Sequence, residues 1–389
     1  MKRVCIVRRK HYPWQKNVKR NAEALASAGY EVDVICLARK GESRHETING
    51  VNVHRLSLAH HRNNVFWYFC DYAVFFMVTS LILAWFSLRK RYDIIEVNTM
   101  PDFLVFITLV PKLLGSKIIL YMYEDMPALF MSSFGKEPSH IGVKILRWIE
   151  KISASYAHHV IVSDGLPYKR VLEKHGIPSD KITVILNVPD DAIFDTATIT
   201  VTQDERHFRL IVVSTLIKRY GIQTLIRAMP SICERVPELL VDVVGEGEYF
   251  PALEEMACSL GVRQYINFIG LVRHDEVPYY ISRAHVGVAP MIADVGAPNK
   301  LFEYSALARP SISSDLPGIR AVFDDDCVLY FPPDDERELA ARVLDLYLNP
   351  EKMFALGCRA QSHYEKYRWS SLRHEYLKVY SGLLDNSWQ

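Results

Sequence analysis

Residues 208–244 read FRLIVVSTLIKRYGIQTLIRAMPSICERVPELLVDVV, and this stretch contains a complete strand–helix–strand pattern. The apolar, β-branched run at 208–213 predicts a buried strand. Residues 221–235 predict a helix, and the apolar run at 239–244 predicts a second strand. Buried strands that alternate with helices form βαβ units, in which the strands are parallel. The stretch therefore predicts a parallel sheet covered by helices.

The same alternation extends in both directions along the chain. Further strands are predicted at 3–7, 32–37, 51–53, 93–97, 117–121, 159–162, 266–269, 285–290 and 310–313. Between the two series, residues 195–205 are polar and rich in threonine. We therefore predict two Rossmann-like, doubly wound α/β domains, at 1–195 and 206–365, joined by a linker and followed by a last helix at 366–389. Ligands of such sheets bind at the carboxyl ends of the strands, so a cleft between the domains is the expected site.

Composition excludes several classes of protein. The chain has 389 residues, of which 49% are hydrophobic and 23% charged, as in ordinary globular proteins rather than disordered, collagen-like or coiled-coil chains. The net charge of +1 argues against nucleic acid as the main partner. Seven scattered cysteines indicate reduced thiols in a cytoplasmic protein rather than disulfides or a zinc site. The first apolar run stops at Arg8, which is too short for a signal peptide.

The segment 65–88 is unusually apolar. Its only charged side chain is Asp71, and Arg89-Lys90-Arg91 follows it. A membrane-spanning helix needs about 20 apolar residues, and the predicted strand at 93–97 must return at once to the sheet, which argues against a span. A helix lying in the membrane surface and a helix buried in the domain core both stay open.

The N-terminal region is basic. Before Glu23 the chain carries eight cations and no acid: Lys2, Arg3, Arg8, Arg9, Lys10, Lys16, Lys19 and Arg20. Several of them follow the first predicted strand, at the ligand-binding edge of the sheet. Cations there suit an anionic ligand such as a diphosphate or lipid headgroups, and the alternative is an ordinary basic surface.

The strongest local motif is Ala297-Pro298-Asn299-Lys300-Leu301-Phe302-Glu303-Tyr304. Proline is tolerated at the start of a helix, and the free N–H groups there form an anion site. Lys300 adds a cation, and the carboxylate of Glu303 could accept hydrogen bonds from ribose hydroxyls. This arrangement suits a nucleoside diphosphate, although a plain N-terminal turn would look the same. The turn Gly245-Glu246-Gly247 is a weaker signal, because it lacks the third glycine of a dinucleotide fingerprint.

Taken together, the motifs resemble family 4 of the GT-B-fold glycosyltransferases. The similarity extends in order through Asn98-Thr99-Met100-Pro101-Asp102, Arg219-Tyr220-Gly221, Gly245-Glu246-Gly247, Phe268-Ile269-Gly270, residues 297–310, Ser313-Ser314-Asp315 and Trp369 with Tyr376 and Tyr380. It implies a GT-B fold, with two Rossmann-like domains facing across a cleft and a C-terminal helix crossing back to the N-terminal domain. It also implies a retaining enzyme that takes sugar from a nucleotide diphosphate, requires no metal, and holds its acceptor in the N-terminal domain.

The resemblance also implies roles for individual residues. Arg219, Lys300 and Glu303 correspond to the catalytic positions, with Glu303 as the ribose-binding glutamate. The donor would also contact Lys218, Gly245, Gly270, Leu271, Asn299, Leu301 and Phe302, with the amides of Leu301 and Phe302 on the diphosphate. The acceptor side would include Arg9, Lys16, Arg20, Asn98, Tyr123 and Glu124.

Three positions depart from the family pattern. Val295, beside Asp294, stands where the family often has an acid; Tyr123 stands for a histidine; and Ser214-Thr215 stands for an arginine. We therefore expect either a retaining glycosyltransferase of polysaccharide or glycolipid assembly, or a catalytically silent paralogue that acts as a partner subunit. A third hypothesis is a dinucleotide oxidoreductase, but the sequence lacks the complete glycine fingerprint of that class. The expected donor is a UDP-sugar, and a GDP-sugar is the alternative. No cofactor besides this donor substrate is expected. The expected acceptor is a membrane-associated glycan or a lipid-linked sugar, and the expected location is the cytoplasm at the inner face of the plasma membrane, with peripheral membrane contact.

Overall fold

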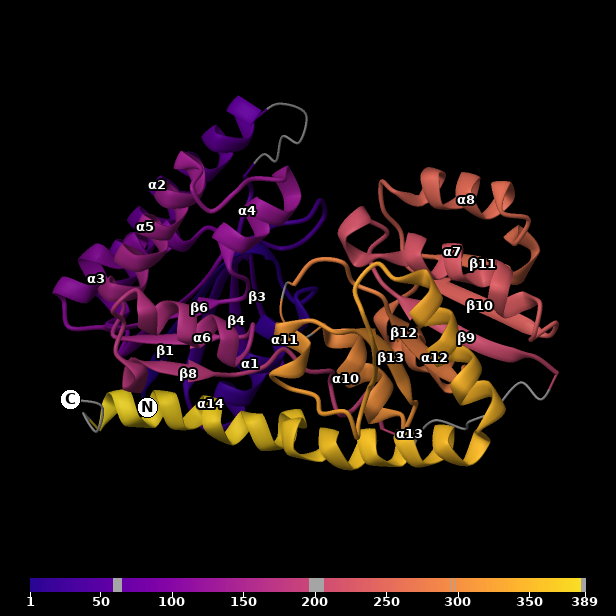
Figure 1. Ribbon diagram of the computed structural model, residues 1–389. Coiled ribbons are helices and arrows are strands. Elements are labelled where there is room, and N and C mark those ends of the chain that lie inside the picture. Colours follow the sequence, from indigo (N-terminus) through magenta and orange to yellow (C-terminus); the bar gives the residue numbers. More distant parts are fainter. Residues whose placement is uncertain (59–64, 196–205, 295, 297, 386–389) are drawn as a thin grey trace. The chain divides into compact units, whose positions relative to one another are not determined.

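The computed structural model describes residues 1–58, 65–195, 206–294, 296 and 298–385, and it divides into two compact units (Figure 1). The N-terminal unit comprises Met1–Asn187 and Leu372–Gln389, and the C-terminal unit comprises Val188–Ser371. The boundary between the two units, after Asn187, therefore precedes the predicted linker at 195–205. Residues 196–205 of that linker lie outside the described residues. The reason is local: the carboxylate of Asp191 accepts hydrogen bonds from the backbone amides of Trp369 and Ser370, so this segment belongs to the C-terminal unit.

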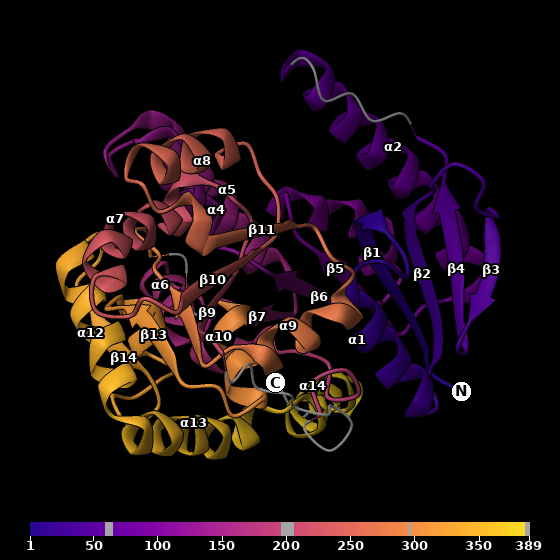
Figure 2. The same ribbon diagram turned by 90° about the vertical axis from the view of Figure 1, so that its right-hand side faces the viewer.

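The N-terminal unit is built on an eight-stranded sheet with the order β3-β4-β2-β1-β5-β6-β7-β8, which Figure 2 shows from β3 to β6. All neighbouring strands are parallel except β3 and β4. The strands are β1 (Arg3–His11), β2 (Glu31–Leu37), β3 (His45–Ile48), β4 (Val51–Leu56), β5 (Ile94–Asn98), β6 (Lys117–Met122), β7 (His159–Val162) and β8 (Ile182–Val184). The strand order reverses between β1 and β5, so their carboxyl ends mark the expected ligand edge.

Helices cover both faces of this sheet. They are α1 (Lys16–Ser27), α2 (Val65–Lys90), the 3-10 helix η1 (Asp102–Thr108), α3 (Leu109–Leu113), α4 (Met126–Phe134), α5 (Ile141–Tyr156), α6 (Leu166–Lys174) and the C-terminal helix α14 (Trp369–Leu384), which belongs to this unit from Leu372 onward. Phe75 of α2, Ala154 of α5 and Leu172 of α6 share one core with alternate residues of the strands. The opposite face carries Glu96 of β5, which α14 contacts through two tyrosines.

Helix α2 has two different apolar faces. Phe75, Thr79, Leu83 and Ser87, four residues apart, are buried, and Phe75 and Leu83 belong to the core of the unit. Val74, Met77, Leu81, Trp85 and Leu88, on the other face, are exposed. Of the helices in the described part of the chain, α2 is the one that is long and apolar enough, by length and composition, to cross a membrane, over residues Cys70–Lys90. About a third of the most apolar part of this segment is buried within the protein. Helix α2 therefore packs one face into the core of the unit and presents a second apolar face at the surface.

The C-terminal unit contains a six-stranded parallel sheet with the order β11-β10-β9-β12-β13-β14. Its strands are β9 (Phe208–Val213), β10 (Leu239–Val244), β11 (Ile266–Gly270), β12 (Val286–Ala289), β13 (Ser311–Ser314) and β14 (Leu329–Phe331). Its helices are α7 (Ile222–Cys233), α8 (Phe250–Ser259), α9 (Val277–Arg283), α10 (Asn299–Ala306), α11 (Pro317–Arg320), α12 (Glu336–Leu348) and α13 (Pro350–Tyr364). The predicted α/β class with two doubly wound, mainly parallel sheets is confirmed.

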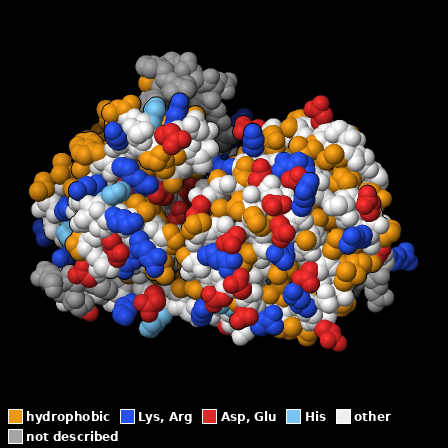
Figure 3. All heavy atoms as spheres, in the orientation of Figure 1, with side chains coloured by type: hydrophobic (Ala, Val, Ile, Leu, Met, Phe, Trp, Pro, Cys, Tyr) orange, Lys and Arg blue, Asp and Glu red, His pale blue; other side chains and the backbone are white. Residues whose placement is uncertain are grey.

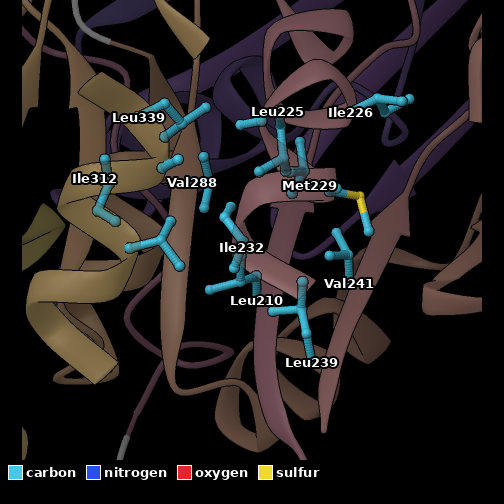
Figure 4. Close-up of a cluster of buried hydrophobic side chains, with 14 of the residues drawn as sticks. Leu210, Leu225, Ile226, Met229, Ile232, Leu239, Val241, Val288, Ile312 and Leu339 are labelled. Carbon is cyan, nitrogen blue, oxygen red and sulfur yellow. The ribbon is translucent and has the colours of Figure 1, made fainter. Parts of the chain in front are cut away.

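The core of the C-terminal unit follows directly from the stretch at 208–244. Leu210 of β9 and Val241 of β10 pack against Leu225, Met229 and Ile232 of α7 (Figure 4). The strand order reverses between β9 and β12. The carboxyl ends of these two neighbouring strands are therefore the place where a ligand site of this unit is expected.

Candidate functional site

Helix α10 begins close to the reversal point of the C-terminal sheet. Pro298 precedes it in an extended conformation (φ −74°, ψ 137°), and Asn299 is its first residue. Lys300 and Glu303 lie one turn apart on the helix, a spacing that places two side chains on one face. Both are nearly covered, with exposed fractions of 7% and 9%. The structure thus places the two predicted residues side by side in a desolvated position.

Lys300 reaches from α10 to the end of β9. Its Nζ donates a hydrogen bond to Oγ of Ser214 at 3.0 Å, and it lies 4.9 Å from the centre of the Tyr220 ring. Burial lowers the pKa of Lys300 to about 8, and attraction to Glu303 acts in the opposite direction. The resemblance led us to expect an arginine at the end of β9, where Ser214 stands. In the structure, Ser214 instead binds Lys300, so a lysine supplies the positive charge at this strand end. A buried cation with one neutral hydrogen-bond partner is well suited to an arriving anion.

Arg219 and Lys218 belong to the 3-10 turn η3 (Lys218–Tyr220). The carbonyl of Arg219 accepts a hydrogen bond from the amide of Ile292, just beyond β12, at 3.0 Å. Its guanidinium carbon lies 5.4 Å from the centre of the Tyr220 ring, the ring that Lys300 also approaches. Two predicted catalytic cations thus lie close to one aromatic side chain. Tyr220 was not among the predicted site residues, because its contact with Lys300 depends on tertiary packing.

Two glycines allow the loops of this site to pack closely. Gly221 adopts φ +71°, and a Cβ atom there would lie 1.6 Å from the carbonyl oxygen of Pro290. Gly245 adopts φ +133°, and a Cβ atom would lie 1.9 Å from the carbonyl oxygen of Ser214. Only glycine avoids both clashes. The amide of Gly245 also donates to the carbonyl of Gly270 at 2.8 Å, which ties together two predicted donor-binding glycines, whereas the neighbouring Leu271 is exposed.

Two of the residues around the start of α10 are engaged in contacts within the unit. The amide of Leu301 already donates to the carbonyl of Pro298 at 3.0 Å, so it is not one of the free N–H groups of the helix end. The side chains of Leu301 and Phe302 are buried in the unit. The carboxylate of Asp294 accepts a hydrogen bond from the amide of Gly318 at 3.1 Å, which ties its loop to α11, and its substitution for the missing acid stays a prediction. Val295 and Ala297 lie outside the described residues.

The predicted acceptor-side residues lie toward the carboxyl ends of the strands in the N-terminal unit, and they differ in burial and in their contacts. The Arg9 guanidinium lies 3.7 Å from the centre of the Tyr72 ring, and Arg20 is buried. Asn98 is fully buried and accepts a hydrogen bond from the hydroxyl of Tyr123 at 2.8 Å. Lys16 and Glu124 are exposed. The structure therefore joins Asn98 and Tyr123, and Arg20 lies close enough for its charge to act on Tyr123, whereas Arg9 stacks on the ring of Tyr72. Among the described residues, no three His, Cys, Asp or Glu side chains are grouped to hold a metal ion.

Comparisons with known proteins identify both halves of the chain. A family model described as "Glycosyl transferase 4-like domain" matches residues 15–187, and one described as "Glycosyl transferases group 1" matches residues 207–349. An uncharacterised glycosyltransferase of Methanocaldococcus jannaschii is 27% identical over 92% of this chain and 91% of its own length. A GDP-mannose-dependent phosphatidylinositol monomannoside mannosyltransferase of Mycolicibacterium smegmatis is 29% identical over 41% of this chain and 44% of its own length.

Solved structures agree with the fold. Sucrose-phosphate synthase from Thermosynechococcus elongatus has a TM-score of 0.77 at 17% identity and covers 99% of this chain and 100% of its own. HepE from Anabaena, solved in complex with UDP-glucose, has a TM-score of 0.73 at 14% identity and covers 98% of this chain and 100% of its own. The two matched domains, in this order and on this fold, show that the chain is a glycosyltransferase and belongs to family 4 of the GT-B-fold enzymes.

Proposed function

We propose that this enzyme is a retaining glycosyltransferase that moves a sugar from a UDP-sugar to a lipid-linked or glycan acceptor held by the N-terminal unit. The product belongs to a cell-surface polysaccharide or a glycolipid. The observation that carries the donor assignment is the desolvated Lys300 beside Glu303 at the beginning of α10. A buried cation, a helix N-terminus and a carboxylate one turn later match a diphosphate and its ribose.

The reaction explains why cations are needed there. As the bond between sugar and diphosphate breaks, the sugar acquires oxocarbenium character and negative charge grows on the leaving phosphate. Preorganised positive groups that meet this growing charge lower the barrier. Lys300 and Arg219, which both lie close to the ring of Tyr220, supply two such groups. The leaving phosphate can accept the proton of the acceptor hydroxyl, so no separate general base is required.

Replacing Arg219 with alanine is expected to lower kcat about 10²-fold or more, with a smaller effect on donor affinity. Removal of one group that stabilises transition-state charge has an effect of roughly 10²–10³-fold in other enzymes. Arg283→Ala is the matched control, because the Arg283 guanidinium also lies over a tyrosine ring, that of Tyr279, at 5.3 Å. Steady-state kinetics and donor titration measure the two effects. A loss of donor affinity with unchanged kcat would remove Arg219 from the transition state.

The choice of nucleotide can be tested directly. HepE, the structural neighbour, was solved with UDP-glucose, whereas the mycobacterial relative is GDP-mannose-dependent. We expect transfer or slow hydrolysis of UDP-sugars by the purified protein in the presence of a lipid extract. Turnover of GDP-sugars alone would show that the nucleotide is wrongly assigned. A complete lack of turnover would favour the silent partner subunit.

We further propose that the enzyme works at the inner face of the plasma membrane. The support is the set of exposed apolar side chains on α2, α3 and α5 of the N-terminal unit, and Figure 3 shows hydrophobic and basic side chains together on one face of this unit. The set comprises Val74, Met77, Leu81, Trp85, Leu88, Leu109, Val110, Leu113, Leu114, Ile141, Ile145 and Trp148. Arg89, Lys144 and Lys151 are exposed beside it, whereas the acids of these helices, Asp71 and Glu150, are buried. Apolar side chains bordered by cations suit an anionic lipid surface.

Replacing Leu81, Leu113 and Trp148 together with glutamine, one on each helix, should release the protein from vesicles of phosphatidylcholine and phosphatidylglycerol. Full burial of one such side chain contributes about 1.5–3 kcal/mol, so we expect roughly a hundredfold or greater loss of binding. The melting temperature should stay the same because these side chains are exposed. The control replaces Leu260, Leu348 and Phe354, which are exposed on the other unit. Equal losses in both triple variants, or unfolding of the first, would contradict the proposed membrane face.

A further inference from the structure

A chain of buried polar contacts connects helix α14 with the carboxyl ends of β1, β5 and β6. Its centre is Glu96, which is fully buried in β5. The hydroxyls of Tyr376 and Tyr380 donate to Oε2 of Glu96 at 2.9 and 2.7 Å. Nδ2 of Asn98 donates to Oε1 at 2.8 Å. The carboxylate therefore has a donor on each oxygen, as a buried carboxylate requires.

These contacts fix the orientation of the next two side chains. Because the amide nitrogen of Asn98 is bound to Glu96, its Oδ1 is free to accept the hydroxyl of Tyr123, at 2.8 Å. The ring of Tyr123 stacks on that of Tyr121, with 4.7 Å between the ring centres. The guanidinium carbon of Arg8 lies 4.5 Å from the centre of the Tyr123 ring. The chain of contacts thus ends at an arginine that an aromatic ring holds in place.

Arg8 is paired in register with Asn98 where β1 meets β5, at the reversal of the strand order. Its Nε and Nη1 are covered and have no hydrogen-bond partner among the described residues. Burial lowers the pKa of Arg8, which reflects the cost of desolvating this cation. Arg9, the residue singled out from the sequence, stacks on Tyr72 instead. Glu124 acts on Arg8 by charge, but the described residues form no ion pair with its guanidinium. A guanidinium placed in this way at the ligand edge of a parallel sheet is a suitable partner for a phosphate group.

We infer that Arg8 binds a phosphate group of the acceptor, and that Glu96 is a positioning residue that holds Asn98, Tyr123 and thereby Arg8 in place. This inference rests on the proposed function, because it deepens the description of the acceptor. It also gives α14 a role beyond packing: its two tyrosines fix the Glu96 carboxylate from which the contacts begin. The phosphate would be that of a lipid diphosphate-linked sugar or of a phosphorylated glycan.

The first test measures phosphate binding without catalysis. Inorganic pyrophosphate is titrated into the full chain carrying Lys300→Met, which weakens the donor side. Adding Arg8→Met should weaken the remaining binding at least tenfold. Lys10→Met, which removes the charge of an exposed neighbour, should change it less than twofold. Equal effects of the two substitutions would show a diffuse basic surface and overturn the assignment of Arg8.

The second test separates positioning from stability. With a membrane lipid extract as acceptor, Tyr123→Phe and Tyr380→Phe should raise the acceptor KM severalfold and leave the donor KM unchanged. Tyr168→Phe is the control, since it removes a similar buried hydrogen bond, to Glu150 at 3.0 Å, in a different network. If all three variants raise the acceptor KM equally, the role of Glu96 is only structural. If the wild type shows no turnover, the proposed function fails, and the pyrophosphate titration still decides the role of Arg8.

Discussion

Replacing Glu303 with alanine is expected to lower the affinity for the nucleotide diphosphate donor by roughly 10²–10⁴-fold. Two ribose hydroxyls that donate to one carboxylate form two charge-assisted hydrogen bonds, each contributing about 1.5–3 kcal/mol. Every 1.4 kcal/mol corresponds to a tenfold change in affinity, which gives the range. The carboxylate is nearly covered, so water replaces the lost contacts poorly. Titration of UDP into the purified protein measures the effect.

Two controls make the result specific. Glu303→Gln keeps one acceptor oxygen and loses the charge, so the affinity should fall between those of the wild type and the alanine variant. Glu351→Ala removes an exposed carboxylate from α13 and should leave the affinity within twofold. Unchanged UDP affinity in Glu303→Ala would place the nucleotide elsewhere in the molecule. A lower melting temperature without UDP would instead indicate that Glu303 supports the fold.

Much of the fold could be predicted because buried parallel strands are continuous apolar runs. β9 and β10 occupy the predicted residues, and most other strands differ by a few residues at their ends. The strands that were missed carry no such signal. β3 is an antiparallel edge strand whose residues are mainly exposed, and β8 and β14 have three residues each. Short or edge strands depend on their neighbours in space, which local sequence does not reveal.

The site was predictable where it depends on spacing within one helix and not where it depends on packing between elements. The proximity of Lys300 and Glu303 follows from their three-residue separation. The bond from Lys300 to Ser214 joins residues that are 86 positions apart, and it exists because β9 lies beside β12 in the sheet. The contacts of Tyr220 and Arg8 likewise need the folded neighbours. The hydrogen bond from the amide of Leu301 to the carbonyl of Pro298 was also not predicted, because it depends on how tightly the first turn of α10 is wound.

Raising the pH through about 8 is expected to weaken donor binding and to stabilise the donor-free protein. The pKa of Lys300 is lowered to about 8 by burial, whereas an exposed lysine titrates near 10.4. Between these values the unfolded chain holds one more proton than the folded chain at this residue, so the free energy of unfolding rises with pH. Donor binding has the opposite dependence, because a diphosphate favours the protonated amine. Its affinity should fall by up to about tenfold per pH unit above pH 8.

Lys300→Met separates this effect from all other titrations in the same range. The variant should lose the pH-dependent part of donor binding between pH 8 and 10 and should be more stable than the wild type below pH 8, because it removes a buried cation. Its kcat should fall roughly 10²–10³-fold, as for a group that meets the charge of the leaving phosphate. Urea unfolding and UDP titration across pH 7–10 measure the two dependences. If both proteins show the same pH profile for UDP affinity, another cation binds the diphosphate, and Lys300 serves only to join α10 to the end of β9 through Ser214.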